Sequence, residues 1–246
     1  MDGTAAPLAL EMHHPQLLLG ALLAEGLVVA PAAGALQARV DEAELQRRGG
    51  GGVPETTRGA VRDLLRAGGF KPTGRSKPSS EYIANVAARG EFPRINNVVD
   101  VANLISLESA LPVSLLDLDR TLGDAAGLVV RLGHAGESFV FNASGQVIDV
   151  AGLICVARAG GPALGCPVKD AWESKSHAGT RRALAVVYGT RAVMARADME
   201  AILERFARLL AEHAGAVTRW WVLPTAAVGA APPHGGVRGS ATERPD

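Results

Sequence analysis

The chain has 246 residues, of which 48% are hydrophobic, and this length allows a sizeable core in one large domain or two small ones. Its 25 basic and 25 acidic residues cancel, and the pI is near 7.0. A neutral chain is not a protein that coats polyanions with its whole surface, so any contact with a nucleic acid is expected to be local.

Disulfide, metal and cofactor chemistry are not expected. Cys155 and Cys166 are the only cysteines, and a chain of this length does not need a disulfide to fold. Two sulfurs without a neighbouring histidine cluster cannot complete a zinc site. His13 and His14 are expected at the surface or at a strand end rather than on a metal.

The first regular element is an apolar run over residues 17–24, between Pro15 and Gly26. The run is too short to cross a bilayer. No Lys or Arg precedes it and Glu11 does, so it does not have the pattern of a secretion signal. We predict a buried strand or hairpin, and a cytoplasmic protein that makes no membrane contact.

Three helices are predicted next. The first covers residues 35–48 and ends at the glycines of 49–52, which we expect to form a flexible surface loop, because they lack the Lys-Ser/Thr of a P-loop. The second covers residues 56–67 and is stopped by two glycines. The third covers residues 82–88, with Ser79 or Ser80 as its cap.

A fourth helix, which starts near Asn96, has two distinct faces. Its apolar stripe consists of Val98, Val101, Ala102 and Ile105. Asn96, Asp100 and Asn103 follow the i, i+4, i+7 spacing and share a polar stripe. The polar stripe either lines a site or is simply solvated, or it caps the neighbouring loop.

The second half of the chain is rich in strands. Runs at 128–132, 138–142, 147–156 and 183–188 are separated by turns. An amphipathic helix opened by Asp198 follows, and then a strand over 217–223 that contains Trp220 and Trp221. Residues 225–246 have no periodicity, so we predict a domain over 1–224 and a disordered tail over 225–246.

A local surplus of positive charge lies in the middle of the neutral chain. Residues 66–94 hold six basic residues against two acidic ones, a surplus of about four charges that points to an anionic partner. The basic residues are Arg66, Lys71, Arg75, Lys77, Arg89 and Arg94, and the acidic ones are Glu81 and Glu91.

Several motifs resemble one known family. The segment INNVVDVANLISLESALPVS at 95–114, followed by similar motifs at 117–120, 129–131 and 136–139, is similar to the editing module of the bacterial phenylalanyl-tRNA synthetase beta subunit. The Lys-Pro-x-Gly-Arg-x-Lys-Pro run at 71–78 resembles free-standing relatives of that module. The similarity extends over roughly residues 8–215, and no segment resembles an aminoacylation domain.

The resemblance implies an α+β fold, a mixed β-sandwich-like core with flanking helices. It also implies hydrolysis of a mischarged aminoacyl-tRNA by a held water, so the expected partner is tRNA or aminoacyl-tRNA rather than DNA. The phosphates would be held by Lys71, Arg75, Lys77 and Arg94. The amino acid and the terminal ribose would be held by Asn96, Asn97, Asp100 and Asn103. The glycine-lined pocket wall of the family corresponds to Gly160, Gly161 and Gly165, which are otherwise ordinary turn glycines.

The departures from the family bear on catalysis. Asn103 keeps the pocket asparagine, but the threonine before it is Ala102, and the pocket histidine is replaced by Ser114. Ser114 has no proton that titrates near neutral pH, so a wall or hydrogen-bonding role is expected. The family's acidic residue, which reads a hydroxyl of the substrate, corresponds to Asp170 or Glu173. A changed pocket predicts a changed amino acid.

Three hypotheses follow. The first is a trans-acting deacylase of mischarged tRNA, with Asn103 and Ser114 in its pocket. The second is a non-catalytic module that binds tRNA or aminoacyl-tRNA and presents it to a partner enzyme. The third is a pocket for a free amino acid or small metabolite. His177 is a weaker candidate for a base, and Trp172 for stacking on the terminal adenine, since loop residues of these types are commonly solvated or anchor the loop.

Overall fold

The computed structural model describes residues 8–48, 52–122 and 127–223. The strands are β1 (Leu8–Leu10), β2 (Leu17–Glu25), β3 (Val113–Asp117), β4 (Leu128–Leu132), β5 (Ser138–Val140), β6 (Val147–Asp149), β7 (Ile154–Arg158), β8 (Ala163–Gly165), β9 (Arg182–Thr190) and β10 (Val217–Leu223). The helices are α1 (Gly34–Arg48), α2 (Glu55–Arg66), α3 (Ser79–Ala88), α4 (Asn97–Ser109), α5 (Leu118–Thr121) and α6 (Arg196–Ala214), with 3₁₀ turns η1 (Gly74–Ser76) and η2 (Trp172–Ser174).

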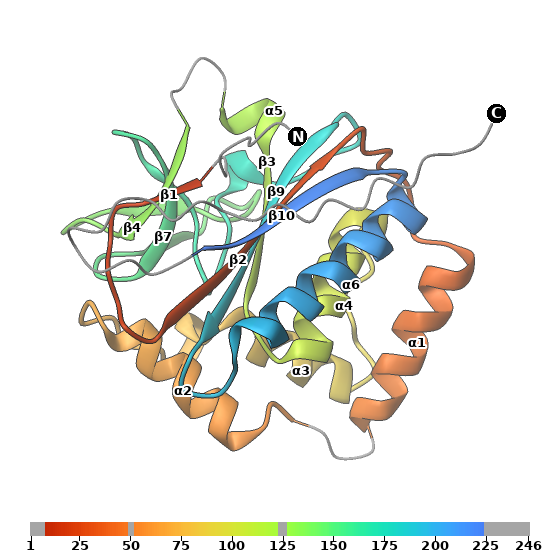
Figure 1. Cartoon of the computed structure of the whole chain (residues 1–246), viewed down its shortest axis with the longest axis horizontal. Helices are drawn as coiled ribbons and strands as arrows, with labels where there is room; N and C mark the ends of the chain where they lie inside the picture. The colour runs from red at the N-terminus through yellow and green to blue at the C-terminus, as the bar shows by residue number, and fades with distance from the viewer. Residues whose placement is uncertain (1–7, 49–51, 123–126, 224–246) are drawn as a thin grey trace.

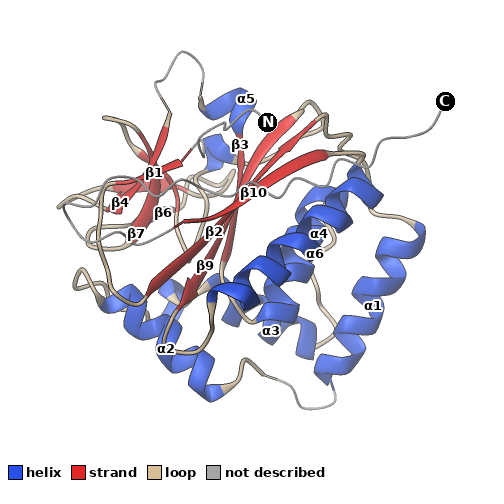
Figure 2. Cartoon of the chain, viewed as in Figure 1, coloured by secondary structure: helices blue, strands red, loops and turns tan. Residues whose placement is uncertain are grey.

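Two four-stranded sheets and a group of helices form three layers (Figures 1 and 2). The central sheet is antiparallel, in the order β10-β2-β9-β3. The second sheet has the order β1-β4-β7-β8, with β1 and β4 parallel, and β5 and β6 form a separate hairpin. On the other side of the central sheet lie α1, α3, α4 and α6 (Figure 1).

The apolar run of β2 is buried on both of its faces. Leu17, Leu19 and the residues alternating with them pack in a cluster with β4, β7 and β8 of the second sheet. Leu18 and Leu22 point the other way, into the larger cluster that the helices share. This two-sided burial explains why the strand is apolar throughout rather than alternating.

A close approach of α6 to the central sheet depends on Gly20. A Cβ built on Gly20 would lie 2.6 Å from the Sδ of Met199 and 3.0 Å from the Leu203 methyls, so a larger residue would require these two side chains of α6 to shift. At the start of α6, the Oδ2 of Asp198 accepts a hydrogen bond of 2.7 Å from the backbone of Ala195. The sequence had identified Asp198 as the residue that opens this helix.

The fold class predicted from the sequence is confirmed, because the structure mixes helices with antiparallel sheets in an α+β arrangement. The strand predicted over 147–156 is two strands, since Gly152 turns the chain with a φ of 68°. The predicted cap of the third helix is wrong: Ser79 is the first helical residue, and no side chain caps the helix. The predicted loop at 49–52 falls mostly, and the predicted tail at 225–246 entirely, outside the described residues.

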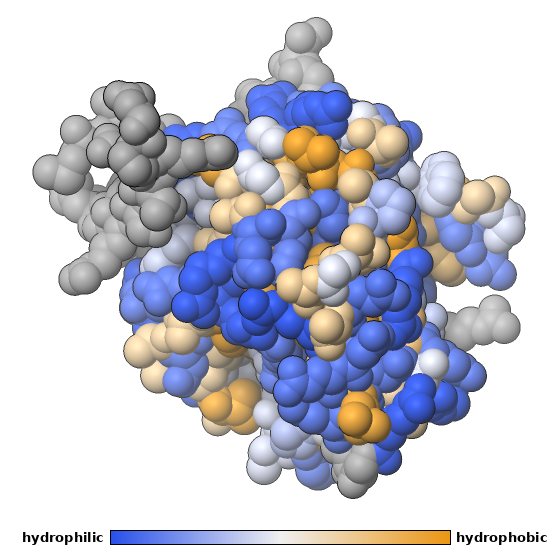
Figure 3. Space-filling view, turned by 90° about the vertical axis from the view of Figure 1, so that its right-hand side faces the viewer, coloured by the Kyte–Doolittle hydropathy of each residue, from blue (hydrophilic) through white to orange (hydrophobic). Residues whose placement is uncertain are grey.

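None of the helices in the described ranges has the length and apolar character needed to span a bilayer. The helical side of the molecule is largely hydrophilic, with hydrophobic side chains in small separate patches (Figure 3). This face therefore offers no extended apolar area.

Candidate functional site

A buried polar cluster lies where β3, β8 and β9 meet. Ser114 of β3 and Tyr188 of β9 are fully buried, and the Ser114 Oγ lies 3.1 Å from the Tyr188 hydroxyl. The same Oγ lies 3.3 Å from the carbonyl oxygen of Cys166. Asp170 reaches the cluster from the loop after β8, and its Oδ2 accepts a hydrogen bond of 3.0 Å from the backbone of Leu115.

The second carboxylate oxygen of Asp170 is buried and has no hydrogen-bond partner among the described residues. It faces Gly165, where an added Cβ would lie 2.6 Å from the Asp170 Oδ1 and 3.2 Å from the Ser114 Oγ. Gly165 and Asp170 also pair as an isolated β-bridge. A residue larger than glycine at position 165 would displace the Asp170 Oδ1 and the Ser114 Oγ. We call Ser114, Gly165, Asp170 and Tyr188 the Asp170 cluster.

Burial dominates the electrostatics of this cluster. It raises the pKa of Asp170 to about 6, against the opposing effects of the Ser114 hydroxyl, the Leu115 amide and the charge of Lys175. Burial also raises the pKa of Tyr188 well above its ordinary value. At neutral pH Asp170 is therefore mostly an ionised carboxylate with one oxygen left to accept a hydrogen bond.

Three of the four polar residues predicted on α4 have structural contacts. The side chain of Asn96 caps the helix by accepting from the Val99 amide at 2.9 Å. Asn97 is buried; its amide nitrogen donates to the carbonyls of Val28 and His213, and its oxygen accepts from Ala30. Through these hydrogen bonds Asn97 connects α4 to α6 and to the segment before α1.

Asn103 differs from its neighbours. Its side chain is half-buried and makes no hydrogen bond within the described ranges. It lies on α4, which packs against β3, the strand that carries Ser114. No hydrogen bond of the described residues joins Asn103 to the Asp170 cluster. The side-chain amide of Asn103 is therefore available to a ligand.

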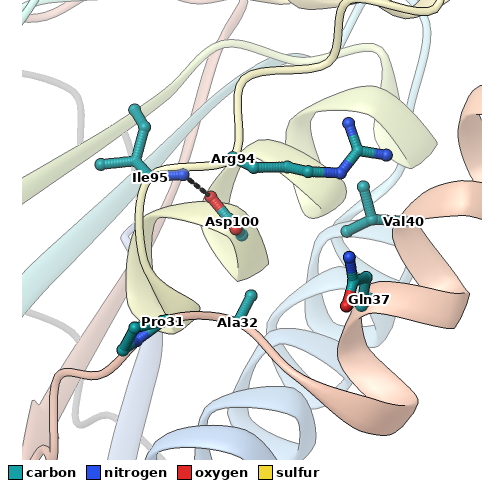
Figure 4. A pocket seen from close by; sticks show the side chains of 7 residues that line it. All are labelled: Pro31, Ala32, Gln37, Val40, Arg94, Ile95 and Asp100. Carbon is teal, nitrogen blue, oxygen red and sulfur yellow. Dashed lines mark hydrogen bonds between the residues drawn. The ribbon is translucent and has the colours of Figure 1, made fainter.

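Asp100 belongs to a separate shallow hollow between α1 and α4 (Figure 4). Its Oδ1 accepts a hydrogen bond of 2.8 Å from the Ile95 amide, and burial raises its pKa. The hollow encloses about 480 Å³, part of it open to solvent. Its walls are Pro31, Ala32, Gln37, Val40, Arg94, Ile95 and Asp100. With one cation and one anion in its lining, it has no preference for an anionic ligand.

Gly160 and Gly161 lie away from Gly165, in a second hollow at the turn between β7 and β8. There Arg131 and Glu137 form a bidentate pair of 2.7 and 2.8 Å, and Arg131 also donates to the carbonyl of Gly161. The Arg131 guanidinium lowers the pKa of Glu137 to about 2. The predicted glycine wall is thus divided between two places, and at the second the Arg131 guanidinium is already paired with Glu137.

Most arginines of the basic region are neutralised by neighbouring acids. Arg66 pairs with Asp63, and Arg89 pairs with Glu91. Arg94 donates to Asp41 at 2.6 Å and to Glu44 at 3.3 Å, both on α1. The surplus of four charges read from the sequence is therefore smaller in the folded chain.

The other cations proposed for tRNA lie on one connecting segment. Lys71 and Lys77 are exposed and form no ion pair within the described ranges. Arg75 lies between them, in η1. This segment therefore carries the unneutralised part of the basic region.

The remaining candidates lie on the loop between β8 and β9. Glu173 is exposed and lies 3.7 Å from Arg158, so Asp170 rather than Glu173 joins Ser114. His177 has both ring nitrogens occupied: Nδ1 accepts from the Gly179 amide at 3.0 Å, and Nε2 lies 3.4 Å from Asp117. A histidine held in this way has no free nitrogen with which to activate a water.

Trp172 is partly exposed, with 46% of its surface accessible. Within the described ranges, no group of three or more His, Cys, Asp or Glu side chains is arranged to hold a metal ion. The sequence analysis missed Tyr188 because it ends an apolar run that predicts a plain buried strand. Its hydroxyl, the one polar side-chain group of that run, was the available signal.

A family model described as the B3/4 domain matches residues 70–215, more than half of the chain. The chain belongs to the B3/4 domain family. This domain is found in the phenylalanyl-tRNA synthetase beta subunit, so the resemblance stated from the sequence is confirmed and the chain is a synthetase-related module. The matched range contains Lys71, Asn103, Ser114 and Asp170.

One solved structure similar to the chain is an N-terminal fragment of the phenylalanyl-tRNA synthetase beta subunit from Pyrococcus horikoshii. The identity is 9% and the TM-score 0.46, and the match covers 89% of this chain. It covers 55% of the other chain, so this protein spans about half of that length. A search of curated proteins gives no match.

Proposed function

We propose that the chain is a trans-acting deacylase, which hydrolyses the ester bond of mischarged aminoacyl-tRNA. The observation that supports this proposal most directly is the unpartnered Oδ1 of Asp170, buried beside Ser114 and Gly165. An orphaned buried carboxylate oxygen is costly unless a donor meets it. A hydroxyl or ammonium group on the aminoacyl moiety is such a donor.

Selectivity follows from the same geometry. A site built to accept a hydrogen bond rejects a substrate without the donor far more strongly than an apolar pocket rejects an extra methylene. In this chain Ser114 already contacts both Tyr188 and the Cys166 carbonyl, so Asp170 is the group that discriminates. The rejected amino acid therefore carries a hydrogen-bond donor on its side chain.

The remaining roles are assigned by chemistry. Asn103, half-buried and without an internal hydrogen bond, orients the ester or the terminal ribose. The exposed Lys71 and Lys77 hold phosphates of the tRNA. Ser114 is not the nucleophile, because among the described residues its Oγ contacts the Tyr188 hydroxyl and the Asp170 carboxylate lies beside it, and no histidine forms a hydrogen bond with it. The attack is by water, and backbone amides stabilise the developing oxyanion.

The test is deacylation of tRNA charged with each amino acid in turn. The wild-type chain is expected to clear one or a few species, all of which carry a hydrogen-bond donor on the side chain. Asp170→Asn and Asn103→Ala should each abolish the activity. Asp63→Asn, at an exposed carboxylate of α2, is the matched control and should leave it unchanged.

A second candidate function is binding of aminoacyl-tRNA without hydrolysis, in order to present it to a partner enzyme. The replacement of the family's histidine by Ser114 favours this candidate, and so does the absence of a free nitrogen on His177. In the same panel of charged tRNAs, this second function predicts that charged tRNA binds to the protein and is protected. No species should then lose its amino acid faster than it does in buffer alone. That result would exclude the deacylase.

A further inference from the structure

The two edges of the central sheet differ. At one edge β3 is covered by the loop after β8, where Asp170 accepts a hydrogen bond from the Leu115 amide. At the other edge β10 pairs with β2 along all seven of its residues, Val217–Leu223, without a bulge. Within the described ranges its backbone forms one further hydrogen bond, from the Arg196 guanidinium to the carbonyl of Val222 at 3.3 Å. Because alternate residues of an edge strand point their amides and carbonyls outward, β10 offers a row of donors and acceptors to another strand.

The sequence of β10 lacks the features that keep an open edge unpaired. Natural proteins protect such edges with lysine, proline, a bulge or a very short strand. The sequence VTRWWVL contains neither lysine nor proline, and its length exceeds the usual strand of about five to six residues. Its one charged side chain, Arg219, is paired with Glu25 of β2 at 2.9 Å. Val217 is 71% exposed, more than any other large hydrophobic residue in the described ranges.

The strand is complementary to itself when two copies run antiparallel about a two-fold axis through Trp220. In this register Trp220 lies opposite Trp220 of the second copy, and Arg219 lies opposite Trp221. The exposed Val217 lies opposite Leu223 and is covered by it. Aromatic residues directly opposite each other stabilise an antiparallel pair, and an arginine beside a tryptophan ring forms a cation–π contact.

Both faces of such a pair would carry an aromatic contact. Trp220 is partly buried against the cluster that the helices share, and Trp221 is partly buried against the cluster between the two sheets. Each ring therefore has surface left for a neighbour on its own face of the sheet. These contacts distinguish a second copy from an arbitrary peptide, because they depend on the same sequence being present on both sides.

The charges around β10 also permit a second copy. α6 packs over β10, so a two-fold axis through Trp220 brings two α6 helices towards each other. This helix carries three arginines and four acidic residues, and the whole chain is neutral, so the two copies do not repel each other strongly. One strand and part of one helix supply fewer than the about 20 to 30 residues per side of a standard interface. A dissociation constant in the micromolar range is therefore expected.

We propose that the chain forms a two-fold dimer in which β10 pairs antiparallel with β10 of a second copy. The pairing joins the two central sheets, each of four strands, into one sheet of eight. β3 and the Asp170 cluster lie at the opposite edge of each central sheet, so they remain at the two ends of the joined sheet. The proposal is independent of the proposed function.

The experiment is sedimentation velocity of the full chain at concentrations from about 1 to about 100 µM. Wild type should pass from monomer to dimer over this range. Val217→Lys should weaken the dimer about fivefold or more, because it places an ammonium group beside Leu223 in both halves of the interface. Leu45→Lys, at a similarly exposed hydrophobic residue of α1, is the matched control and should dimerise as wild type.

The register is measured with a nitroxide label attached to a Val217→Cys variant. The native Cys155 and Cys166 are buried and should not take the label. Because Val217 lies opposite Leu223 of the second copy, the two labels are separated by six residues along the strands. At about 3.3 Å per residue, the pulsed electron paramagnetic resonance distance should be about 20 Å.

Three results would overturn the proposal. They are a wild type that stays monomeric over the whole range, a dimer that Val217→Lys and Leu45→Lys weaken equally, and a label distance far from about 20 Å. Hydrogen exchange on the monomer adds a fourth. Protection of every amide of 217–223 would mean that another segment of the chain already occupies the edge, since β2 can protect only alternate amides.

Discussion

Replacing Asp170 by asparagine should change how stability depends on pH. Burial raises the Asp170 pKa from 3.8 to about 6, a difference of about two units, which corresponds to about 3 kcal/mol. The folded chain binds this proton more tightly than the unfolded chain does. The free energy of unfolding therefore falls as pH rises from about 4 to about 6, and above pH 6 the full cost of the buried charge is present.

The asparagine variant has no such proton. Its amide oxygen can keep the hydrogen bond from Leu115, while its NH₂ group takes the position that faces the Ser114 Oγ. Urea denaturation of both proteins at a series of pH values from 4 to 8 measures the difference between them. The variant should gain about 3 kcal/mol relative to wild type between pH 4 and pH 7.

Groups present in both proteins, such as Asp100 with its raised pKa and Glu137 with its lowered one, cancel in this difference. Asp63→Asn, at an exposed carboxylate, should give a curve parallel to wild type. If the Asp170→Asn curve were also parallel to wild type, Asp170 would not be the desolvated, unsatisfied carboxylate on which the proposed function depends.

Four further stability predictions can be checked by thermal and urea unfolding. Gly68→Ala should destabilise the chain by more than about 2 kcal/mol, because the new Cβ would lie 2.2 Å from the carbonyl oxygen of Gly152. Gly59→Ala should stabilise the chain by up to about 1 kcal/mol, because this position in the interior of α2 has open space for a Cβ. Glu137→Gln should cost about 3 kcal/mol above pH 5, by leaving the partner guanidinium buried and unpaired, and the cost should shrink as pH falls toward 2. Asn97→Ala should cost about 2 to 4 kcal/mol, because two carbonyls and an amide lose their buried partner; a smaller loss would mean that water replaces the side chain.

The strands and helices could be predicted where local pattern and burial agree. The apolar run at 17–24 predicted a buried strand, and β2 is buried on both faces as that pattern requires. The helix was predicted to start near Asn96, and α4 begins at Asn97. The cap bond from the Val99 amide to the Asn96 side chain was not predicted, although it is local in sequence. The contact between the start of α3 and the loop after β8 was not predictable, since one hydrogen bond between Ser79 and Pro167 joins parts of the chain that share no local pattern.

The candidate site was harder to predict than the fold, for a physical reason. Asn97 and Asp100 have the composition of a polar helix face, but which way each side chain points depends on how α4 rotates against its neighbours. The structure turns Asn97 inward, onto backbone atoms of Val28, Ala30 and His213. A buried asparagine that satisfies three backbone groups and one that binds a ligand look alike in a single sequence.

The same difficulty affects the count of charges, and here the identity of the cation helps. The planar guanidinium of arginine matches the geometry of a carboxylate, and in this chain such pairs connect helices. Arg62 pairs with Glu81 and joins α2 to α3, and Arg205 pairs with Glu108 and joins α6 to α4. These arginines contribute little to the electrostatic potential that a ligand experiences, because a neighbouring carboxylate neutralises the charge of each. Lysine lacks this planar group, and in the described ranges no lysine forms an ion pair. In the described ranges, the positive charge that remains available to an anionic partner is therefore carried by the four lysines and by Arg120, Arg181, Arg191 and Arg208, none of which forms an ion pair.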